Sequence, residues 1–481
     1  MKILTCYMLF LLLFIGTGAS AQVGVPLFTT HFPAEEFAAR RNKVYDAIGK
    51  DAIAVLQGAP SPAGYVRFRQ SNEFFYLSGI EVPHAYLILN GANRTASLYL
   101  PHRNEGRERS EGKMLAAEDA DEIKKLSGIE NVYGAELMNE ALGRMSAMKT
   151  AYTPFAPAEG MAMSRDLAVR ALADASSDSW DGSGSREGAF INKLRSRFPK
   201  FEIMDLTPTL DGLRLIKSPL EIEQIKKASR LSGLSIMEAM RSVEPGMYEY
   251  ELDAAAKYIY YRNGAQGDAY YSLIASAENA YYPHYNAGKR LMKDGDFLLM
   301  DYSPDFAYYM SDLTRMMPVN GKFSATQREL YGFYLACYKS ILKHIKPGET
   351  AQNIKKLAAA DMKKILAGSS FSKPIYTDAA KRFVDNYDRS TANPKSSLGH
   401  WIGMATHDVG GYDGSPLRAG MVFTIEPALT VPEERIYIRL EDAIVITDRG
   451  AEIISDFLPM EIAEIEKLMK EKGILQGYPK D

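Results

Sequence analysis

The sequence predicts two folded domains, an α/β domain followed by an α+β domain. In the first part of the chain, short apolar runs such as AIAVLQG and AYLILNG alternate with helical segments such as AAEDADEIKKL, which is typical of interleaved strands and helices. After Lys217, long helical segments alternate with apolar strands such as DFLLMDYS and MVFTIEPAL, which indicates a curved antiparallel sheet with helices beside it. We place the boundary near residues 205–215 and the two domains over residues 22–210 and 211–481.

Length and composition are those of an ordinary globular protein. The chain has 481 residues, of which 46% are hydrophobic and 24% are charged, and this excludes a disordered, collagen-like or coiled-coil chain. Its 57 basic and 60 acidic residues give a net charge of −3. No general basic field is present, so we expect no nucleic acid partner.

The first 21 residues are predicted to be a signal peptide that is removed on export. Lys2 precedes the apolar run ILTCYMLFLLLFIG, and Ala19-Ser20-Ala21 stand before Gln22, which is the pattern of a secretory signal and its cleavage site. The apolar run is shorter than the ~20 residues that span a membrane, and no second long apolar stretch follows. We therefore expect an exported, soluble protein, periplasmic or secreted, that does not associate with the membrane after cleavage.

Cysteine is nearly absent, because Cys6 and Cys337 are the only two in the chain. Signal cleavage would leave Cys337 alone, which excludes an internal disulfide and a thiolate zinc cluster. Any metal ion must therefore be held by carboxylates and by the seven histidines.

Local signals place several helices and one prominent loop. Ser218 followed by Pro219 and nearby acidic residues predicts a helix start, and further helices are expected over about 246–263 and 324–345. Residues Ser176–Arg186 (SSDSWDGSGSR) are rich in Ser, Gly and Asp, which predicts a loop.

Two aspartates belong to one predicted hairpin in the second domain. Asp301 ends the apolar strand FLLMD, and Asp312 begins SDLTRMMPV. A hairpin centred near Phe306–Ala307 would make them cross-strand neighbours about 5 Å apart at Cα. Carboxylates that close repel one another unless a cation or a shared proton lies between them.

Three further residues end or interrupt apolar strands in the same region. His400 lies among glycines in LGHWIGM, Glu426 ends MVFTIE, and Glu441 lies in RIYIRLEDAIVI, where Arg439 shares its face. Four carboxylates and one imidazole suit Mn²⁺, with Zn²⁺, Co²⁺ and Fe²⁺ as alternatives, and bridging carboxylates can hold two ions about 3.5–4 Å apart. Taken singly, each acid is more simply explained as a solvated strand end, so spacing alone leaves both interpretations open.

These segments resemble the pita-bread metallopeptidase family, M24, which includes Xaa-Pro aminopeptidase (aminopeptidase P), prolidase and methionine aminopeptidase. The family pattern is an Asp, a second Asp eleven positions later in S-D-x-T-R, then G-H-x-x-G, x-E-P and R-x-E-D. This chain matches every part of it, and the resemblance implies five metal ligands: Asp301, Asp312, His400, Glu426 and Glu441.

The resemblance also implies a role for each residue. Asp312 and Glu441 match the pair that bridges two metal ions, Asp301 matches a ligand of one ion, and His400 with Glu426 match ligands of the other. Glu426 is also expected to act as the proton shuttle.

The same resemblance implies roles for three other residues. His284 and His407 match histidines that line the site without binding metal and contact the substrate carbonyl or its oxyanion. Arg439 is expected to orient the acids rather than to react.

Residues 67–89 (RFRQSNEFFYLSGIEVPHAYLIL) resemble the N-terminal creatinase/aminopeptidase P-like domain, and LIKSPLEIEQIKKA resembles the helix that joins it to the catalytic domain. Methionine aminopeptidases lack this first domain. The resemblance therefore favours the proline-directed branch of the family and covers nearly the whole mature chain.

The chain departs from the family pattern at three places. Tyr302-Ser303-Pro304 follow the first Asp where a small residue and Gly are usual, Ser396 replaces a His four residues before His400, and Thr430 replaces a Tyr after the E-P motif. None of these positions is an expected metal ligand, but the change at Ser396 could alter how substrate is held.

The resemblance implies an aminopeptidase that releases the N-terminal residue from peptides with proline in the second position, by attack of a metal-bridging hydroxide. A prolidase acting on Xaa-Pro dipeptides uses the same ligands and stays an alternative. A metal-free peptide- or protein-binding relative is disfavoured, because all five ligands are present. By analogy with the family, we also expect a homo-oligomer.

Overall fold

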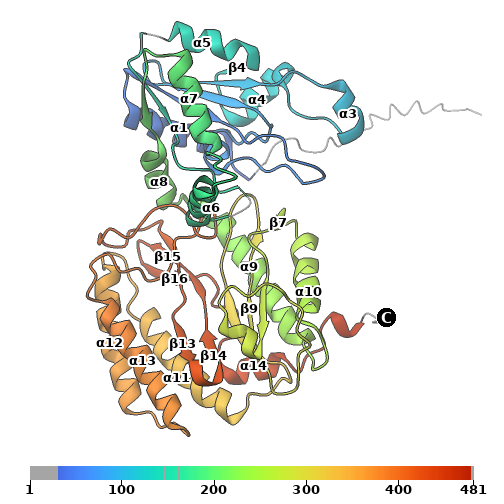
Figure 1. The fold of residues 1–481 in the computed structure, drawn as a ribbon, viewed down its shortest axis with the longest axis vertical. Helices are drawn as coiled ribbons and strands as arrows, with labels where there is room; N and C mark the ends of the chain where they lie inside the picture. Colours follow the sequence, from blue (N-terminus) through green and yellow to red (C-terminus); the bar gives the residue numbers. More distant parts are fainter. Residues whose placement is uncertain (1–30, 146, 161–162, 478–481) are drawn as a thin grey trace, which may run out of the picture.

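The computed structural model describes residues 31–145, 147–160 and 163–477. The predicted signal peptide, with Cys6, lies outside the described residues. In Figure 1 the N-terminal domain lies above the C-terminal domain, and α8 (Thr207–Leu215) leads from one toward the other. The predicted order, an α/β domain followed by an α+β domain, is confirmed.

The N-terminal domain is built on one six-stranded mixed sheet, in the order β4-β3-β2-β1-β5-β6. β1 pairs antiparallel with β2 and parallel with β5, so the two predicted runs AIAVLQG and AYLILNG are neighbours. The strands are β1 (Ala52–Gln57), β2 (Tyr86–Asn90), β3 (Thr95–Leu100), β4 (Asn131–Gly134), β5 (Thr150–Thr153) and β6 (Glu202–Asp205).

Helices cover both faces of this sheet because residues along β1 alternate between two cores. Ile53 and Val55 pack in the core that includes residues of α5 and α7, whereas Ala54 and Leu56 face the core that includes residues of α1 and α2. The helices of this domain are α1 (Ala34–Ile48), α2 (Asn72–Ser78), α3 (Glu105–Glu111), α4 (Ala120–Ser127), α5 (Met138–Arg144), α6 (Arg165–Ser177) and α7 (Arg186–Arg197).

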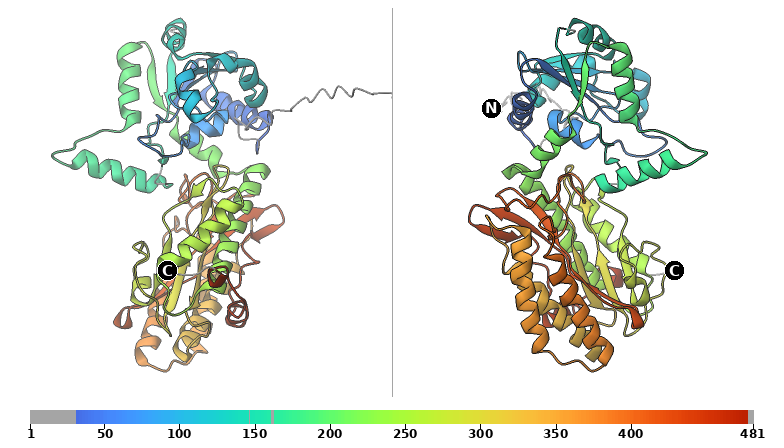
Figure 2. Two further views of the ribbon diagram at one scale, coloured as in Figure 1. Left: turned by 90° about the vertical axis from the view of Figure 1, so that its right-hand side faces the viewer. Right: turned by 60° about the vertical axis from the view of Figure 1, so that its left-hand side comes forward.

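Helix α6 and the loop after it stand away from both domains in Figure 2. The helix ends at Ser177 and α7 begins at Arg186, so the loop predicted around residues 176–186 is confirmed. None of the 13 residues of α6 is buried.

The C-terminal domain has short antiparallel strands between two groups of helices (Figure 1). Helices α9 and α10 lie on one side of the strands, and α11, α12 and α13 on the other. These helices are α9 (Pro219–Ser242), α10 (Glu249–Arg262), α11 (Ala325–Leu342), α12 (Ala351–Ala367) and α13 (Pro374–Ser390), and α14 (Ile462–Leu468) follows the last strand.

Helix α9 begins where the sequence predicts. The Ser218 hydroxyl accepts a hydrogen bond from the backbone N–H of Glu221 (3.3 Å), and the Glu221 carboxylate accepts one from the N–H of Ser218 (2.9 Å). This reciprocal capping box, with Pro219 in the first turn, fixes the start of the first helix of the C-terminal domain.

Four small groups of strands make up the sheet region of the C-terminal domain. β11 pairs with β9 and β9 with β8, β12 pairs with β15 and β15 with β16, β13 pairs with β14, and β10 pairs with β7. The strands are β7 (Gly267–Asp268), β8 (Leu273–Ser276), β9 (Phe297–Asp301), β10 (Pro304–Asp305), β11 (Thr314–Pro318), β12 (Val422–Ile425), β13 (Ala428–Val431), β14 (Ile436–Arg439), β15 (Asp442–Thr447) and β16 (Gly450–Ile453).

The predicted hairpin register is wrong. Asp301 lies opposite Thr314, not opposite Asp312. The turn is centred on Ala307 and Tyr308, one residue further along than expected, and both adopt left-handed backbone angles (φ of 52° and 71°). Such a two-residue turn matches the twist of the flanking strands but usually carries Gly or Asn, so these residue types do not signal it.

Two predicted strands are each broken at the same level of the sheet. The run MVFTIEPAL divides into β12 and β13 at Glu426-Pro427, and RIYIRLEDAIVI divides into β14 and β15 at Leu440-Glu441. Proline cannot donate to a strand ladder, which accounts for the first break. The register is the same on both sides of the interruption, so Glu426 lies opposite Glu441.

A buried ion network joins the two domains. Arg214 in α8 contacts Glu159 (2.9 Å) and Glu73 (3.1 Å) of the N-terminal domain with Nη1, and Asp408 of the C-terminal domain with Nη2 (2.6 Å). Lys217 Nζ lies 3.2 Å from the other oxygen of Asp408. The side chains of Arg214 and Asp408 are each 1% exposed, so each charge depends on its partners rather than on water.

We expect Arg214→Met to destabilise the protein by about 3–5 kcal/mol, because it leaves buried carboxylates without their counter-charge. Urea unfolding followed by circular dichroism measures the loss. The control is Arg195→Met, at an exposed position of α7. Equal unfolding midpoints for the two variants would contradict this role of the network.

Candidate metal centre

Three acidic residues of the predicted set lie in a row across neighbouring strands. Asp301 at the end of β9 lies opposite Thr314 of β11. Thr314 forms a β-bridge with Glu441 through backbone hydrogen bonds of 3.1 and 3.3 Å, and Glu441 lies opposite Glu426. The Thr314 hydroxyl also donates to the Glu441 carboxylate (2.8 Å), which fixes its orientation.

His400 reaches this row from the loop beside β12. Its carbonyl accepts a hydrogen bond from the Thr424 N–H (2.9 Å), and its own N–H donates to the Thr424 hydroxyl (3.2 Å). The preceding residue must be glycine, because a Cβ on Gly399 would lie 2.1 Å from the Thr424 carbonyl oxygen. The motif G-H-x-x-G therefore brings the imidazole to the end of β12.

The His400 ring faces the carboxylates through Nε2. This nitrogen lies 3.3 Å from Asp312, 3.5 Å from Glu426 and 3.6 Å from Glu441. On the opposite side of the ring, Nδ1 lies 3.2 Å from the Trp401 carbonyl oxygen. That contact requires a proton on Nδ1 and leaves Nε2 free as a ligand.

All five predicted ligands belong to overlapping sets that could hold a metal ion. Within each set, one ligand atom per residue lies within 4.8 Å of the others. The sets are Asp301, Asp312 and Glu441; His400, Glu426 and Glu441; and Asp312, His400 and His407. Asp312, His400 and Glu441 each belong to two of the three sets, so the sets form one continuous group of ligand atoms.

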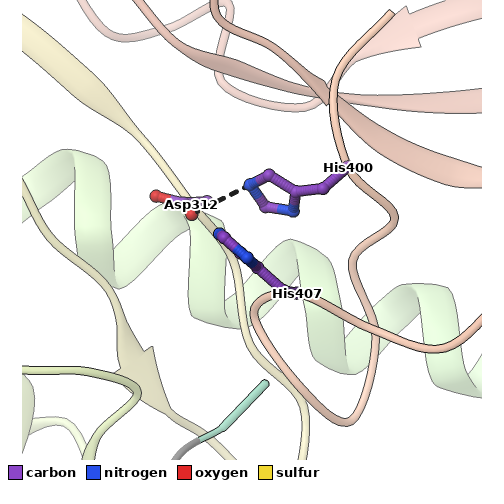
Figure 3. A group of neighbouring side chains, drawn as sticks. All are labelled: Asp312, His400 and His407. Atoms are coloured by element: carbon purple, nitrogen blue, oxygen red, sulfur yellow. Dashed lines mark ion pairs between the residues drawn. The ribbon is translucent and has the colours of Figure 1, made fainter. Parts of the chain in front are cut away.

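His407 lies as close to this group as the predicted ligands do. Its ring centroid is 4.1 Å from that of His400, and both rings approach Asp312 in Figure 3. Burial, followed by the charge of His400, lowers the pKa of His407 to about 4. The ring is therefore neutral near pH 7 and has both a donor and an acceptor nitrogen. That it lines the site without binding metal stays a prediction.

The carboxylates are held in an environment that disfavours their charges. Burial raises the pKa of Asp301 to about 6; the charge of Arg439 opposes this rise and the charge of Glu441 adds to it. Burial and the charge of Glu441 raise the pKa of Glu426 to about 7. Burial and nearby acids also raise the pKa of Asp312 and of Glu441. A divalent cation would relieve this repulsion.

The pKa of His400 also reflects the excess of negative charge in the site. Burial alone would lower its pKa, but the neighbouring carboxylates of Asp312, Glu441 and Glu426 raise it well above its ordinary value. Oε1 of Glu441 is buried and accepts no hydrogen bond from the described residues. An unused ligand atom and a donor set of carboxylates and imidazole fit one or more divalent ions.

Arg439 lies where it can orient two of the acids, as predicted. Its Nη2 forms an ion pair with Asp301, and its Nη1 lies 3.6 Å from Glu426. The side chain is 5% exposed. It compensates part of the negative charge, but one guanidinium and one imidazole do not balance four carboxylates.

Tyr270 contributes to the site and is missed by the sequence analysis. Its hydroxyl lies 2.5 Å from Asp301 Oδ1 and 2.6 Å from Asp312 Oδ1, so it links the two aspartates. Burial and the charges of Asp301 and Asp312 raise the pKa of Tyr270 well above its ordinary value, which keeps the hydroxyl protonated. Tyr270 lies 31 residues before Asp301 in DAYYSLI, and nothing in that segment distinguishes it from a packing tyrosine.

The metal-ligand set forms the wall of a cavity of about 390 Å³. His284 and His407 line the same cavity, so all eight residues singled out by the sequence converge there. The N-terminal domain supplies Met163, Ser164 and Leu167, which the sequence analysis did not anticipate. Their contact with the C-terminal domain joins segments more than 200 residues apart.

Ser396, which replaces the usual histidine, is buried and contacts a lysine. Lys355 of α12 donates from Nζ to the Ser396 hydroxyl (2.7 Å) and to the Ser397 carbonyl (3.1 Å). Burial lowers the pKa of Lys355 to about 8. The other two positions at which the chain departs from the family pattern are also ordered. The Tyr302 hydroxyl donates to Asp253 (2.7 Å), and Thr430 lies opposite Tyr437 in the β13–β14 pair.

The chain matches two family models. Residues 223–448 match the model described as metallopeptidase family M24, and residues 37–152 match the aminopeptidase P N-terminal domain. The chain is 29% identical to the Xaa-Pro aminopeptidase of Haemophilus influenzae over 469 residues, covering 92% of this chain and 99% of that protein.

Solved structures of this family share the fold. A structure described as an aminopeptidase P from Bacillus anthracis has a TM-score of 0.77 at 26% identity, covering 92% of this chain and all of that one. Escherichia coli aminopeptidase P has a TM-score of 0.72 at 28% identity, covering 91% and 98%, and has been solved with the inhibitor Pro-Leu and in a zinc-substituted form with product.

Residues 223–448 belong to metallopeptidase family M24, and residues 37–152 belong to the N-terminal domain of aminopeptidase P. It is a metal-dependent hydrolase with aminopeptidase function. The predicted architecture, an N-terminal creatinase/prolidase-like domain followed by a pita-bread catalytic domain, is confirmed.

We expect divalent metal to stabilise the protein more at about pH 7.5 than at about pH 5. The raised carboxylate pKa values make the metal-free folded state bind more protons than the unfolded chain between about pH 4 and 7. In that range the stability of the metal-free protein falls as pH rises, whereas metal binding displaces the protons. Thermal unfolding with and without Mn²⁺ at both pH values measures the effect.

At a free metal concentration of a hundred times Kd, the stabilisation near neutral pH is about 2.7 kcal/mol. The variant Asp456→Asn, changed at an exposed acid, serves as a control and retains the shift. A shift of equal size at both pH values would contradict proton-linked binding at the carboxylates.

Proposed function

We propose that this protein is an exported aminopeptidase that removes the N-terminal residue from peptides with proline in the second position, using two divalent metal ions. The convergence of the five family ligands with His284 and His407 on one cavity carries this proposal. The substrate class follows from relatives that are Xaa-Pro aminopeptidases over 90% or more of this chain.

The overlap of the set Asp301, Asp312 and Glu441 with the set His400, Glu426 and Glu441 supports a pair of ions. Asp301 would bind one ion, His400 and Glu426 the other, and Asp312 and Glu441 would bridge the two. Oxygen-rich coordination favours Mn²⁺, and Zn²⁺, Co²⁺ and Fe²⁺ suit the same donors. When bound, the metal pair supplies a water with a pKa lowered toward neutrality and a Lewis acid for the peptide carbonyl.

Glu426 is the acid best placed to move a proton to the leaving amine. Its side chain is 27% exposed, whereas those of Asp301, Asp312 and Glu441 are 7% exposed or less. Substrate in the cavity can therefore approach Glu426, and proton transfer needs a carboxylate within hydrogen-bond reach.

His407 and His284 are proposed to hold the substrate carbonyl from different sides. His407 is neutral near pH 7, so its N–H can donate to a developing oxyanion without a prior change in protonation. His284 is exposed at the cavity opening. Arg439 keeps Asp301 and Glu426 in place through its two terminal nitrogens.

We expect metal-stripped protein to leave an Xaa-Pro-Yaa tripeptide intact and to release its N-terminal residue when Mn²⁺ is added. Asp312→Ala should lose at least about a hundredfold in kcat/KM, because even residues that orient metal ligands cost roughly 10–100-fold. Chromatography of the products measures the reaction, and Asp456→Asn is the matched control.

The substrates offered in this assay separate the alternatives. Cleavage of Xaa-Pro dipeptides alone would replace the proposal with a prolidase. No cleavage with any of the four metals by protein that is folded would favour a peptide-binding relative.

The proposal of export is based on the sequence, and the proposal of assembly is based on the family. Among the described residues, no helix is long and apolar enough to span a membrane. Residues 1–21 carry the signal pattern, and we propose a periplasmic or secreted homo-oligomer without membrane attachment. Light scattering on purified protein determines its assembly.

We expect the mature protein to begin at Gln22, because cleavage follows Ala19-Ser20-Ala21. N-terminal sequencing of protein recovered from the periplasm or the medium tests this. A cell-retained protein that begins at Met1 would contradict export, and a variant with Ala21→Glu should block processing without altering the mature domains.

A further inference from the structure

The opening of the catalytic cavity carries two large side chains that the mechanism does not use. Leu167 of α6 is 43% exposed and Tyr271 is 55% exposed, and both line the cavity. His284 is the third exposed residue of the lining. The other lining residues are buried or half-buried, so these three mark the opening to solvent.

Leu167 is held at this opening by backbone contacts between the two domains. Ser164 forms a β-bridge with His407, and the Arg165 N–H lies 3.4 Å from the His407 carbonyl oxygen. The Thr406 N–H donates to the Met163 carbonyl (2.9 Å). The segment before Leu167 is therefore paired with the segment that carries His407.

Side-chain contacts fix the first turn of α6 in the same position. The Ser164 hydroxyl accepts a hydrogen bond from the Leu167 N–H (3.2 Å). Arg165 Nη2 lies 2.5 Å from Glu73 and 3.0 Å from Glu159, within the buried network around Arg214. Leu167 is thus a fixed wall of the opening rather than part of a swinging segment.

The path of the substrate brings its later residues to this wall. In an aminopeptidase the cleaved bond lies against the metal-ligand carboxylates, and three of the four, Asp301, Asp312 and Glu441, are buried here. The N-terminal residue therefore occupies the inner part of the cavity, and the chain beyond proline leaves through the opening. The first residue after proline is the first to reach the exposed side chains.

We propose that Leu167 and Tyr271 form an apolar subsite for the third residue of the peptide substrate. This inference rests on the proposed function. One side of the subsite comes from the N-terminal domain and the other from the catalytic domain, so domain pairing sets its width. The apolar surface of both side chains favours a leucine-like third residue over a small polar one.

The test compares kcat/KM for Ala-Pro-Leu and Ala-Pro-Ser with the Mn²⁺-loaded full chain. The wild-type protein is expected to prefer Ala-Pro-Leu, and Leu167→Ser to reduce that preference by roughly tenfold through KM, because it removes apolar contact made equally in the ground and transition states. Tyr271→Ser should act in the same direction. Leu167→Met, which keeps an apolar side chain, should retain the preference.

Val169→Ser is the matched control, because Val169 lies on the same helix, is 47% exposed and is not part of the cavity lining. It should keep the wild-type ratio. Equal cleavage of both tripeptides by the wild type, or an unchanged ratio in Leu167→Ser, would overturn the subsite and leave the proposed function standing. Cleavage of neither tripeptide by the wild type would overturn both.

Discussion

Four carboxylates and one imidazole converge on one wall of a cavity, and most of their surface is removed from solvent. The side chains of Asp301, Asp312 and Glu441 are 7% exposed or less, so solvation cannot stabilise three negative charges there. Burial and mutual repulsion raise the pKa of each of these acids. Folding around such a group is unfavourable unless protons, cationic side chains or metal ions compensate it. The strand geometry, the hydrogen bonds and the domain arrangement near the site all serve this requirement.

The register of the sheet brings two of the acids together. Glu426 and Glu441 lie opposite one another at the level where β12 changes to β13 and β14 to β15. Residues directly opposite one another in an antiparallel pair point to the same face, so both carboxylates can face the cavity. Arg439 and Tyr270 then supply donors to Asp301 from two directions. Because these donors satisfy only part of the charge, the remaining ligand atoms stay free to bind a cation.

The sequence predicts the ligands better than it predicts their arrangement. The motifs around Asp312 and His400 mark residues whose chemistry and spacing are specific, and the capping signals at Ser218 give the start of α9. The hairpin register was missed because Ala307 and Tyr308 adopt left-handed angles that their residue types do not signal. Local patterns report periodicity and capping, whereas a register depends on turn geometry and on pairing with a partner strand. The sequence does not reveal the role of Tyr270 for a related reason, because its two hydrogen bonds join it to residues 31 and 42 positions away.

The N-terminal domain is part of the catalytic cavity rather than an attachment to it. Met163 and Ser164 pair with Thr406 and His407 through the backbone, and Arg214 ties Asp408, the neighbour of His407, to acids of the first domain. A peptide that enters the cavity therefore meets side chains that do not belong to the catalytic domain. In this chain the ligand set defines the reaction, and the contact between domains shapes the path by which a peptide reaches it.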